Sequence, residues 1–127
     1  SVIDAKKGLQ MFETVSVPVL GVIENMSYFI CDNCTSKHHI FRSGGGERIS
    51  RSLGTPFLGD LPLDPTVAES ADEGRPAMIT QQGSLYYKAF SDVSENLIDQ
   101  IKILNNSNSG AMLQFDLKWN EVPEADQ

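Results

Sequence analysis

The sequence predicts an α/β layered fold with parallel strands, and two observations support this prediction. Two short apolar runs, residues 17–25 (VPVLGVIEN) and 55–63 (TPFLGDLPL), lack polar alternation, as is typical of strands covered on both faces of a parallel sheet. Segments with helical features lie before, between and after these runs, and this αβαβα order is typical of α/β folds. Two strands make a thin sheet, so we expect further strands from an N-terminal part of the protein or from a partner chain.

The first helix and the first strand lead to a predicted binding position. A helix is expected over residues 3–14, where Ala5, Leu9 and Phe12 share one face. The strand that follows ends at the polar residue Asn25. Ligands of open α/β sheets bind beyond the carboxyl ends of the strands, so we expect a binding site near this residue.

The stretch between the two strands is expected to leave the sheet. Residues 27–43 show no helical period and contain aromatic residues, two cysteines and a histidine pair. We interpret them as an excursion built on a hairpin. A helix is then expected over residues 47–54, because Ile49 and Leu53 are spaced i, i+4 and Gly54 is a typical helix stop.

The C-terminal half is expected to be mainly helical. Residues 66–74 (TVAESADEG) predict one or two helical turns that end at Gly74. The longest helix is expected over residues 84–104, and its apolar residues recur at helical spacing. These are Leu85, Ala89, Val93, Leu97, Ile101 and Leu104. We therefore predict one domain over residues 1–104, followed by a linker and acidic tail over residues 105–127.

The composition of the 127 residues argues against several classes of protein. Hydrophobic residues make up 40% and charged residues 21%, as in an ordinary globular domain. The formal net charge of −7 argues against a nucleic-acid partner, which needs clustered Lys and Arg. No apolar run approaches the roughly 20 residues that span a bilayer. On the long helix Lys88 and Lys102 are outnumbered by Asp92, Glu95 and Asp99, which disfavours a membrane-surface helix.

The start of the chain and its cysteine content suggest the origin and the location of the protein. The start, SVIDAKKGL, has no initiator methionine, so we expect a piece of a longer protein. It also lacks the apolar core of a signal peptide. Two cysteines are too few for a disulfide-stapled secreted domain, and we therefore expect a cytoplasmic protein.

The three consecutive glycines at residues 44–46 resemble a phosphate-binding loop only at first sight. Such a loop needs backbone N–H groups at a helix N-terminus, a Lys and a hydroxyl. Here Glu47 follows the glycines, and neither a Gly-Lys-Ser nor a G-x-G-x-x-G pattern occurs. We therefore interpret the glycines as a turn and helix start.

The pair Cys31 and Cys34, in a CxxC pattern, is the stronger chemical signal. Two thiolates at this spacing can bind one metal ion or two irons of a cluster. A thioredoxin-like redox pair is disfavoured, because the motif lies in a polar loop. His38 and His39 would complete a Cys₂His₂ zinc site only at unusually short spacing, so surface histidines without a ligand role are favoured. Two chains that each contribute a CxxC would supply four ligands, and a metal-free dithiol remains open.

Two further segments lie where strands end. Asn25 has an amide that suits the reading of a base edge, although on this residue alone a turn-forming Asn is the favoured explanation. The segment at residues 61–65 (LPLDP) ends the second strand. In it, Asp64 or Thr66 is a candidate N-cap of the next helical turn.

Several of these stretches together resemble one family. VPVLGVIENMSYFIC-x-x-C, GGGERIS and LGTPFLGDLPLDPTVAESADEGRPA are similar to the C-terminal half of the Mrp family of P-loop ATPases. Those proteins are iron–sulfur cluster carriers or scaffolds with a parallel-sheet, SIMIBI-like fold close to that of the MinD and ParA ATPases. The resemblance covers about residues 1–100 with the motifs in family order.

The resemblance implies roles for individual residues. Cys31 and Cys34 match the CxxC that supplies half the ligands of a labile 4Fe-4S cluster bridging a homodimer, from which the cluster passes to apo iron–sulfur proteins. Asn25 matches a residue that contacts the nucleotide base, and the segment with Pro62 and Asp64 matches a wall of the base pocket. The implied cofactors are therefore the cluster and ATP, with Mg in the full-length parent.

The chain also departs from the family pattern. Arg42 stands where the family usually has Gly, and Asp32 where it often has Pro; neither change removes a ligand. The phosphate loop G-K-G-G-x-G-K-[ST] and the magnesium-binding aspartates do not occur in these 127 residues. We expect the parent protein to hydrolyse ATP and this chain alone to be inactive, with no catalytic residue of its own. The alternative is a non-enzymatic zinc-binding or interaction module that uses the same CxxC.

Overall fold

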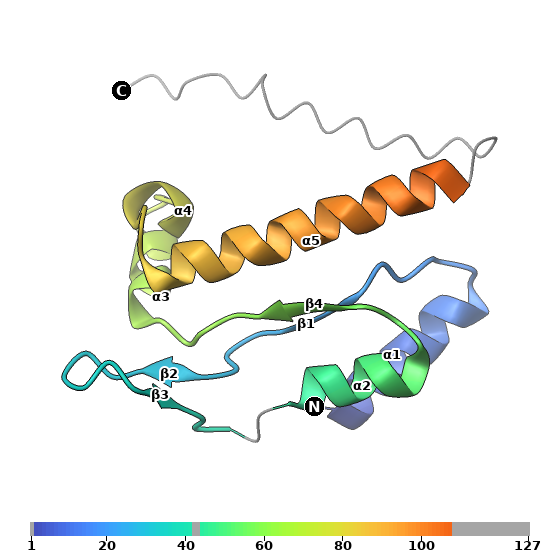
Figure 1. The fold of residues 1–127 in the computed structure, drawn as a ribbon, viewed down its shortest axis with the longest axis horizontal. Coiled ribbons are helices and arrows are strands. Elements are labelled where there is room, and N and C mark those ends of the chain that lie inside the picture. The colour runs from blue at the N-terminus through green and yellow to red at the C-terminus, as the bar shows by residue number, and fades with distance from the viewer. Residues whose placement is uncertain (1, 42–43, 108–127) are drawn as a thin grey trace.

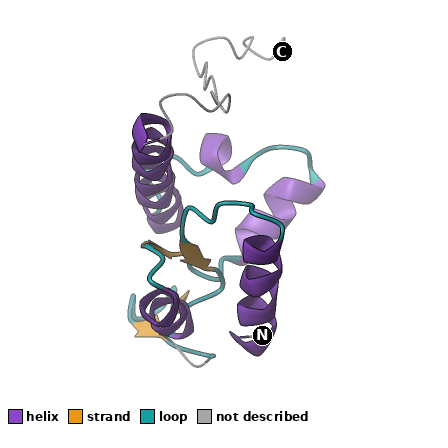
Figure 2. Cartoon of the chain, turned by 90° about the vertical axis from the view of Figure 1, so that its right-hand side faces the viewer, coloured by secondary structure: helices purple, strands orange, loops and turns teal. Residues whose placement is uncertain are grey.

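The computed structural model describes residues 2–41 and 44–107. Its centre is a parallel pair of strands, β1 (Val22–Glu24) and β4 (Phe57–Asp60). Helices α1 (Val2–Thr14) and α2 (Gly45–Leu53) lie on one side of this pair, and α5 (Leu85–Ser107) crosses the other side (Figure 1). The view at right angles shows the same three layers (Figure 2). The predicted α/β layered fold with parallel strands and a long C-terminal helix is confirmed.

The remaining elements lie at the carboxyl end of the strand pair. A hairpin of β2 (Phe29–Ile30) and β3 (Lys37–His38) leaves the sheet there, and the short helices α3 (Pro65–Asp72) and α4 (Ala77–Thr80) lie beside the first turns of α5 (Figure 1). The predicted hairpin excursion is therefore confirmed. Helix α4 was not expected from the sequence; it follows Pro76, whose fixed φ suits the residue before a helix.

The strands are shorter than the apolar runs that predict them. Regular pairing joins Val22 to Phe57 and Glu24 to Asp60, and it begins only after Pro56, which has no N–H to donate. A register irregularity follows Val22, and Gly59 there has a φ of 135°. This is a β-bulge, in which glycine avoids the strain that a side chain would meet.

The core lies on both faces of β4. Leu58 and Val93 are buried where α5 crosses the strand, and Ile49 is buried under α2 on the other face. The side chain of Asn96 donates a hydrogen bond to the Leu58 carbonyl oxygen at 2.8 Å, which ties α5 to the strand. The side chain of Ile23 on β1 is 42% exposed, so the described residues leave this part of the strand uncovered.

The glycine run is a helix start, as predicted. Helix α2 begins at Gly45, and Gly44 precedes it with a left-handed φ of 79°. A Cβ at Gly46 would stand 3.0 Å from Glu24 Cβ and 3.1 Å from Phe57 Cε2. The missing side chain therefore allows α2 to approach the sheet closely.

The helix ends agree with the sequence in most places. Gly54 ends α2 with a φ of 62°, and its N–H donates to the Ser50 carbonyl. Helix α5 continues through Ser107, past the predicted end at residue 104, because no proline or glycine interrupts it before Gly110. The linker and acidic tail were predicted at residues 105–127; residues 105–107 belong instead to α5, and residues 108–127 lie outside the described residues.

Candidate functional site

The hairpin with the CxxC continues directly from the carboxyl end of the strand pair. The Ser27 N–H donates to the Leu61 carbonyl at 2.9 Å, and the Leu63 N–H donates to the Tyr28 carbonyl at 2.7 Å. These bonds extend the β1–β4 alignment past the regular strands. They anchor the base of the hairpin to the rigid part of the fold, so the cysteines have a defined position relative to the sheet.

The turn of the hairpin is closed by the backbone of Cys31. Its N–H donates to the Ser36 carbonyl at 3.2 Å, and its carbonyl accepts from the Thr35 N–H at 2.8 Å. Thr35 has a φ of 54°, a left-handed conformation that is uncommon for a β-branched residue. The loop therefore doubles back sharply enough to return Cys34 toward Cys31.

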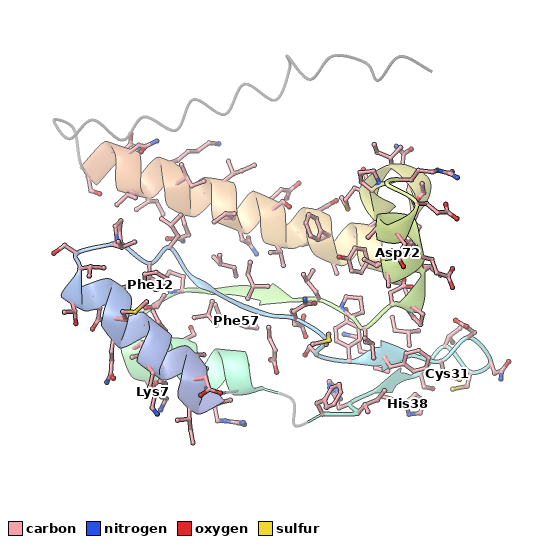
Figure 3. The ribbon with its side chains drawn as sticks, turned by 180° about the vertical axis from the view of Figure 1, so that it is seen from behind. Lys7, Phe12, Cys31, His38, Phe57 and Asp72 are labelled. Atoms are coloured by element: carbon pink, nitrogen blue, oxygen red, sulfur yellow. The ribbon has the colours of Figure 1, made fainter. Side chains whose placement is uncertain are left out.

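The strand register places a histidine on the cysteine face of the hairpin. Phe29 is paired with His38, so their side chains share a face, and Cys31, two residues after Phe29, shares it too. The two Sγ atoms and a ring nitrogen of His38 lie within 4.8 Å of one another. Figure 3 shows Cys31 and His38 together on this hairpin, at the end of the molecule away from α1.

The neighbouring histidine lies on the opposite face. His39 packs edge-on against Tyr28, with ring centroids 6.3 Å apart, and its Nδ1 lies 3.4 Å from the Ser27 carbonyl. Lys37 shares this face, with Nζ 4.1 Å from the centre of the Tyr28 ring. The two histidines therefore have different surroundings, and His38 alone joins the cysteines.

Both cysteines are free thiols; Cys31 is half-buried and Cys34 exposed. The Nε2 atom of His38 lies 3.7 Å from Cys34 Sγ. Hydrogen bonds from His38, followed by those from Ser36 and Cys31, lower the pKa of the Cys34 thiol to about 6. Donors that point at a sulfur favour its anionic form. Thiolate is the form that binds metals, so this cysteine is prepared for ligation near neutral pH.

Sequence reasoning treated His38 as a surface residue without a ligand role. The structure confirms that His38 is exposed and places its ring beside the two thiols, a position that the sequence did not predict. Counting along the chain treats His38 and His39 alike, and two adjacent ligands beside a CxxC are sterically awkward. The available signal was the hairpin itself, because alternation along a strand sends neighbouring side chains to opposite faces. Predicting that signal required the register, which the sequence pattern did not reveal.

The predicted nucleotide contacts lie in two separate hollows. Asn25 is exposed and borders a hollow of about 430 Å³ between β1 and α2 that also includes Gly45 and Gly46. Its Oδ1 accepts from the Met26 N–H at 2.9 Å, as in the turn-forming role considered above. The amide NH₂ group of Asn25 and the second lone pair of Oδ1 are left for a ligand.

Pro62 and Asp64 border a second hollow, of about 330 Å³, together with Phe29 and Tyr86. Asp64 is the N-cap of α3, and its Oδ1 accepts from the Thr66 N–H at 3.0 Å and from the Thr66 hydroxyl at 2.6 Å. The predicted capping role of Asp64 is confirmed. Its contact with a nucleotide, and those of Asn25 and Pro62, stay predictions.

Comparison with known proteins decides the family. Residues 1–98 match the family model described as ParA, the NUBPL iron-transfer P-loop NTPases. The chain belongs to this family. The resemblance inferred from the E-N-M-S, CxxC and P-L-D-P motifs is thereby confirmed.

Several curated members of the NUBPL iron-transfer family are similar over most of the chain. The iron–sulfur cluster transfer protein NUBPL of Dictyostelium discoideum is 41% identical over 103 residues, which are 81% of this chain and 32% of that protein. The iron–sulfur cluster carrier protein of Escherichia coli K12 is 40% identical over 101 residues, 80% of this chain and 27% of that protein. The chain thus spans about a third or less of the relatives it matches.

A solved structure supports the same fold for this family member. A nucleotide-binding protein from Archaeoglobus fulgidus, described as in complex with ADP and with Co, superposes with a TM-score of 0.51 at 32% identity. The match covers 56% of this chain and 29% of that one.

Among the described helices, none combines the length and apolar character needed to cross a bilayer.

Proposed function

We propose that this chain is part of an ATP-dependent iron–sulfur cluster carrier, and that Cys31 and Cys34 hold a labile 4Fe-4S cluster as cargo. The single observation that carries the proposal is the free dithiol on a surface hairpin of a chain in the iron-transfer family. Relatives at 38–44% identity are named as iron–sulfur cluster transfer or carrier proteins. Residues 1–104 form the unit that carries out this role.

A homodimer supplies the ligands that one chain lacks. A four-iron cluster is held by four thiolates, and this chain contains two cysteines. Two hairpins that meet across a two-fold axis present two CxxC pairs to one cluster, because a two-fold interface repeats the same surface patch. The hairpin suits such a contact, since its tip projects from the sheet (Figure 1).

The exposure of the dithiol suits transfer to apo iron–sulfur proteins. Cys34 is exposed and Cys31 half-buried, so thiolates of an acceptor can approach the irons. Transfer proceeds by ligand exchange: each acceptor thiolate forms an Fe–S bond as the bond to Cys31 or Cys34 breaks, and no electron is lost.

The nucleotide part of the proposal concerns the longer parent protein. Of the residues here, Asn25, with Pro62 and Asp64, fits the base end of ATP, because an amide NH₂ group can donate to a base edge. No Gly-Lys-Ser or Gly-Lys-Thr sequence, the motif that binds the phosphates and Mg in P-loop proteins, occurs in the 127 residues. We assign ATP hydrolysis to residues of the parent outside this chain.

The proposed location is the cytoplasm, a compartment that keeps thiols reduced. An exposed dithiol carrier requires such conditions, because oxidation to a disulfide would remove both ligands. One relative, from Arabidopsis thaliana, is named as a mitochondrial protein. Cell fractionation with an antibody against the chain distinguishes the two compartments.

Anaerobic reconstitution with iron and sulfide tests the cargo. The wild-type chain is expected to form a brown, iron- and sulfide-containing dimer, measured by absorbance, metal analysis and size-exclusion chromatography. The Cys31→Ser/Cys34→Ser variant should stay colourless with an unchanged circular dichroism spectrum. His39→Ala, on the opposite face of the same hairpin, is the matched control and should bind the cluster. Stoichiometric zinc in the wild type with no iron uptake contradicts the proposal.

A further inference from the structure

The hairpin contains a potential site that is complete within one chain. We propose that Cys31 Sγ, Cys34 Sγ and His38 Nε2 of a single chain bind one divalent cation of the zinc class, with the fourth tetrahedral position open to water or an incoming ligand. The three ligand atoms lie within 4.8 Å of one another. This site is distinct from the shared cluster, because it needs no second chain and adds His38 as a ligand.

The distance between Cys34 and His38 is close to that between two ligands of a tetrahedral zinc centre. Zinc binds Cys sulfur at about 2.3 Å and His nitrogen at about 2.0 Å, so at a tetrahedral angle the two ligand atoms stand about 3.5 Å apart. The observed distance between Cys34 Sγ and His38 Nε2 is 3.7 Å. The spacing of these two atoms therefore suits one shared cation, and Cys31 Sγ lies within 4.8 Å of both.

The hairpin register explains why the short spacing does not strain the site. His38 reaches the cysteines from the opposite strand, where it pairs with Phe29, and not along the loop. Backbone bonds from Cys31 to Ser36 and Thr35 hold the turn closed. His39 stays with Tyr28 on the other face, so the site has one imidazole and two thiols.

The donor set selects the class of cation. Thiolate and imidazole ligands favour zinc, cobalt and ferrous iron, whereas magnesium and calcium prefer oxygen ligands. Three protein ligands with an open fourth position are the arrangement of an exchangeable site, whereas structural zinc sites are closed by four. The exposure of Cys34 and His38 keeps that fourth position accessible.

The two occupancies of the hairpin exclude each other, because both use the same two sulfurs. A chain that holds a cation through Cys31, Cys34 and His38 has no thiolate left to bridge a cluster. His38 separates the two states, since it is required for the single cation and not for the cluster. Its replacement therefore tests this inference separately from the proposed function.

Cobalt titration of the metal-free, reduced 127-residue chain is the decisive experiment. The wild type should show thiolate-to-cobalt charge transfer and tetrahedral d–d bands that saturate at one Co²⁺ per chain, with the protein still monomeric. His38→Ala should bind cobalt at least about 10-fold more weakly. Loss of a residue that only supports a metal ligand already weakens metal affinity by about 10-fold, and loss of a ligand itself should cost more. His39→Ala is the matched control and should titrate as the wild type.

A second variant tests the role of His38 as a ligand. His38→Cys should restore tight binding with stronger charge-transfer absorption, because a third thiolate replaces the imidazole. Equal cobalt affinity of the wild type and His38→Ala, saturation at half an equivalent with dimer formation, or absence of tetrahedral bands would each overturn the inference. If the wild type binds cobalt as expected but forms no cluster on reconstitution, the proposed function fails and the single-cation site stands.

Discussion

Gly59 of β4 faces Val93 of α5 so closely that no side chain fits between them. A Cβ at Gly59 would stand 2.8 Å from Val93 Cγ2, and Val93 is only 6% exposed. The backbone of Gly59 also has a φ of 135°, which residues with side chains rarely adopt. The contact therefore sets how closely the long helix approaches the strand.

Gly59→Ala is expected to destabilise the chain by about 2 kcal/mol or more, because overpacking and backbone strain each cost about 1–3 kcal/mol. Urea unfolding followed by circular dichroism measures the loss. Gly8→Ala in α1 is the control, since a Cβ there meets nothing within 4 Å, and it should stabilise the helix by about 0.5–1 kcal/mol. Equal stability of Gly59→Ala and the wild type would show that α5 is free to shift.

Asn96→Ala is expected to lower the free energy of unfolding by about 1 kcal/mol, the net worth of an ordinary hydrogen bond. The lost bond is the 2.8 Å contact to the Leu58 carbonyl. Glu95→Ala, at the neighbouring exposed position of the same helix, is the control and should stay within about 0.5 kcal/mol of the wild type. Chemical denaturation of the three proteins under one condition provides the comparison.

Asp64→Ala should cost about 1 kcal/mol through loss of the α3 N-cap, since Asp64 Oδ1 accepts from the Thr66 N–H at 3.0 Å. Asp64→Asn keeps a capping oxygen and should retain most of the stability. Thermal unfolding of both variants tests the assignment. A loss of the same size in both would mean that the negative charge, and not the cap, stabilises this segment.

Alkylation of Cys34 in the metal-free chain should rise with pH through a midpoint near 6, because the thiolate is the nucleophile and the pKa of this thiol is lowered to about 6. His38→Ala removes the first cause of that shift, so the midpoint should move to higher pH. His39→Ala should leave it in place. Mass spectrometry of iodoacetamide-treated samples across pH measures the modification of Cys34 separately from that of Cys31.

Much of the fold was predictable because its signals are local. The apolar face of α5 and the glycine at the end of α2 depend on residues a turn apart, and both predictions were correct to within a few residues. Strand length was less predictable. Pairing of Val22 with Phe57 and the bulge at Gly59 depend on a partner far along the chain, which the apolar pattern does not contain.

In the candidate site, too, local features were predictable from the sequence and features that depend on distant segments were not. The sequence by itself determined the family, the two thiols at Cys31 and Cys34 and their position after a buried strand, because short motifs encode these features in contiguous residues. Only the tertiary structure decided that His38 joins the thiols while His39 packs on Tyr28, and that Asn25 and Asp64 border different hollows. The physical reason is that strand register sets the face of each side chain, and register depends on hydrogen bonds between segments that are separate in the sequence.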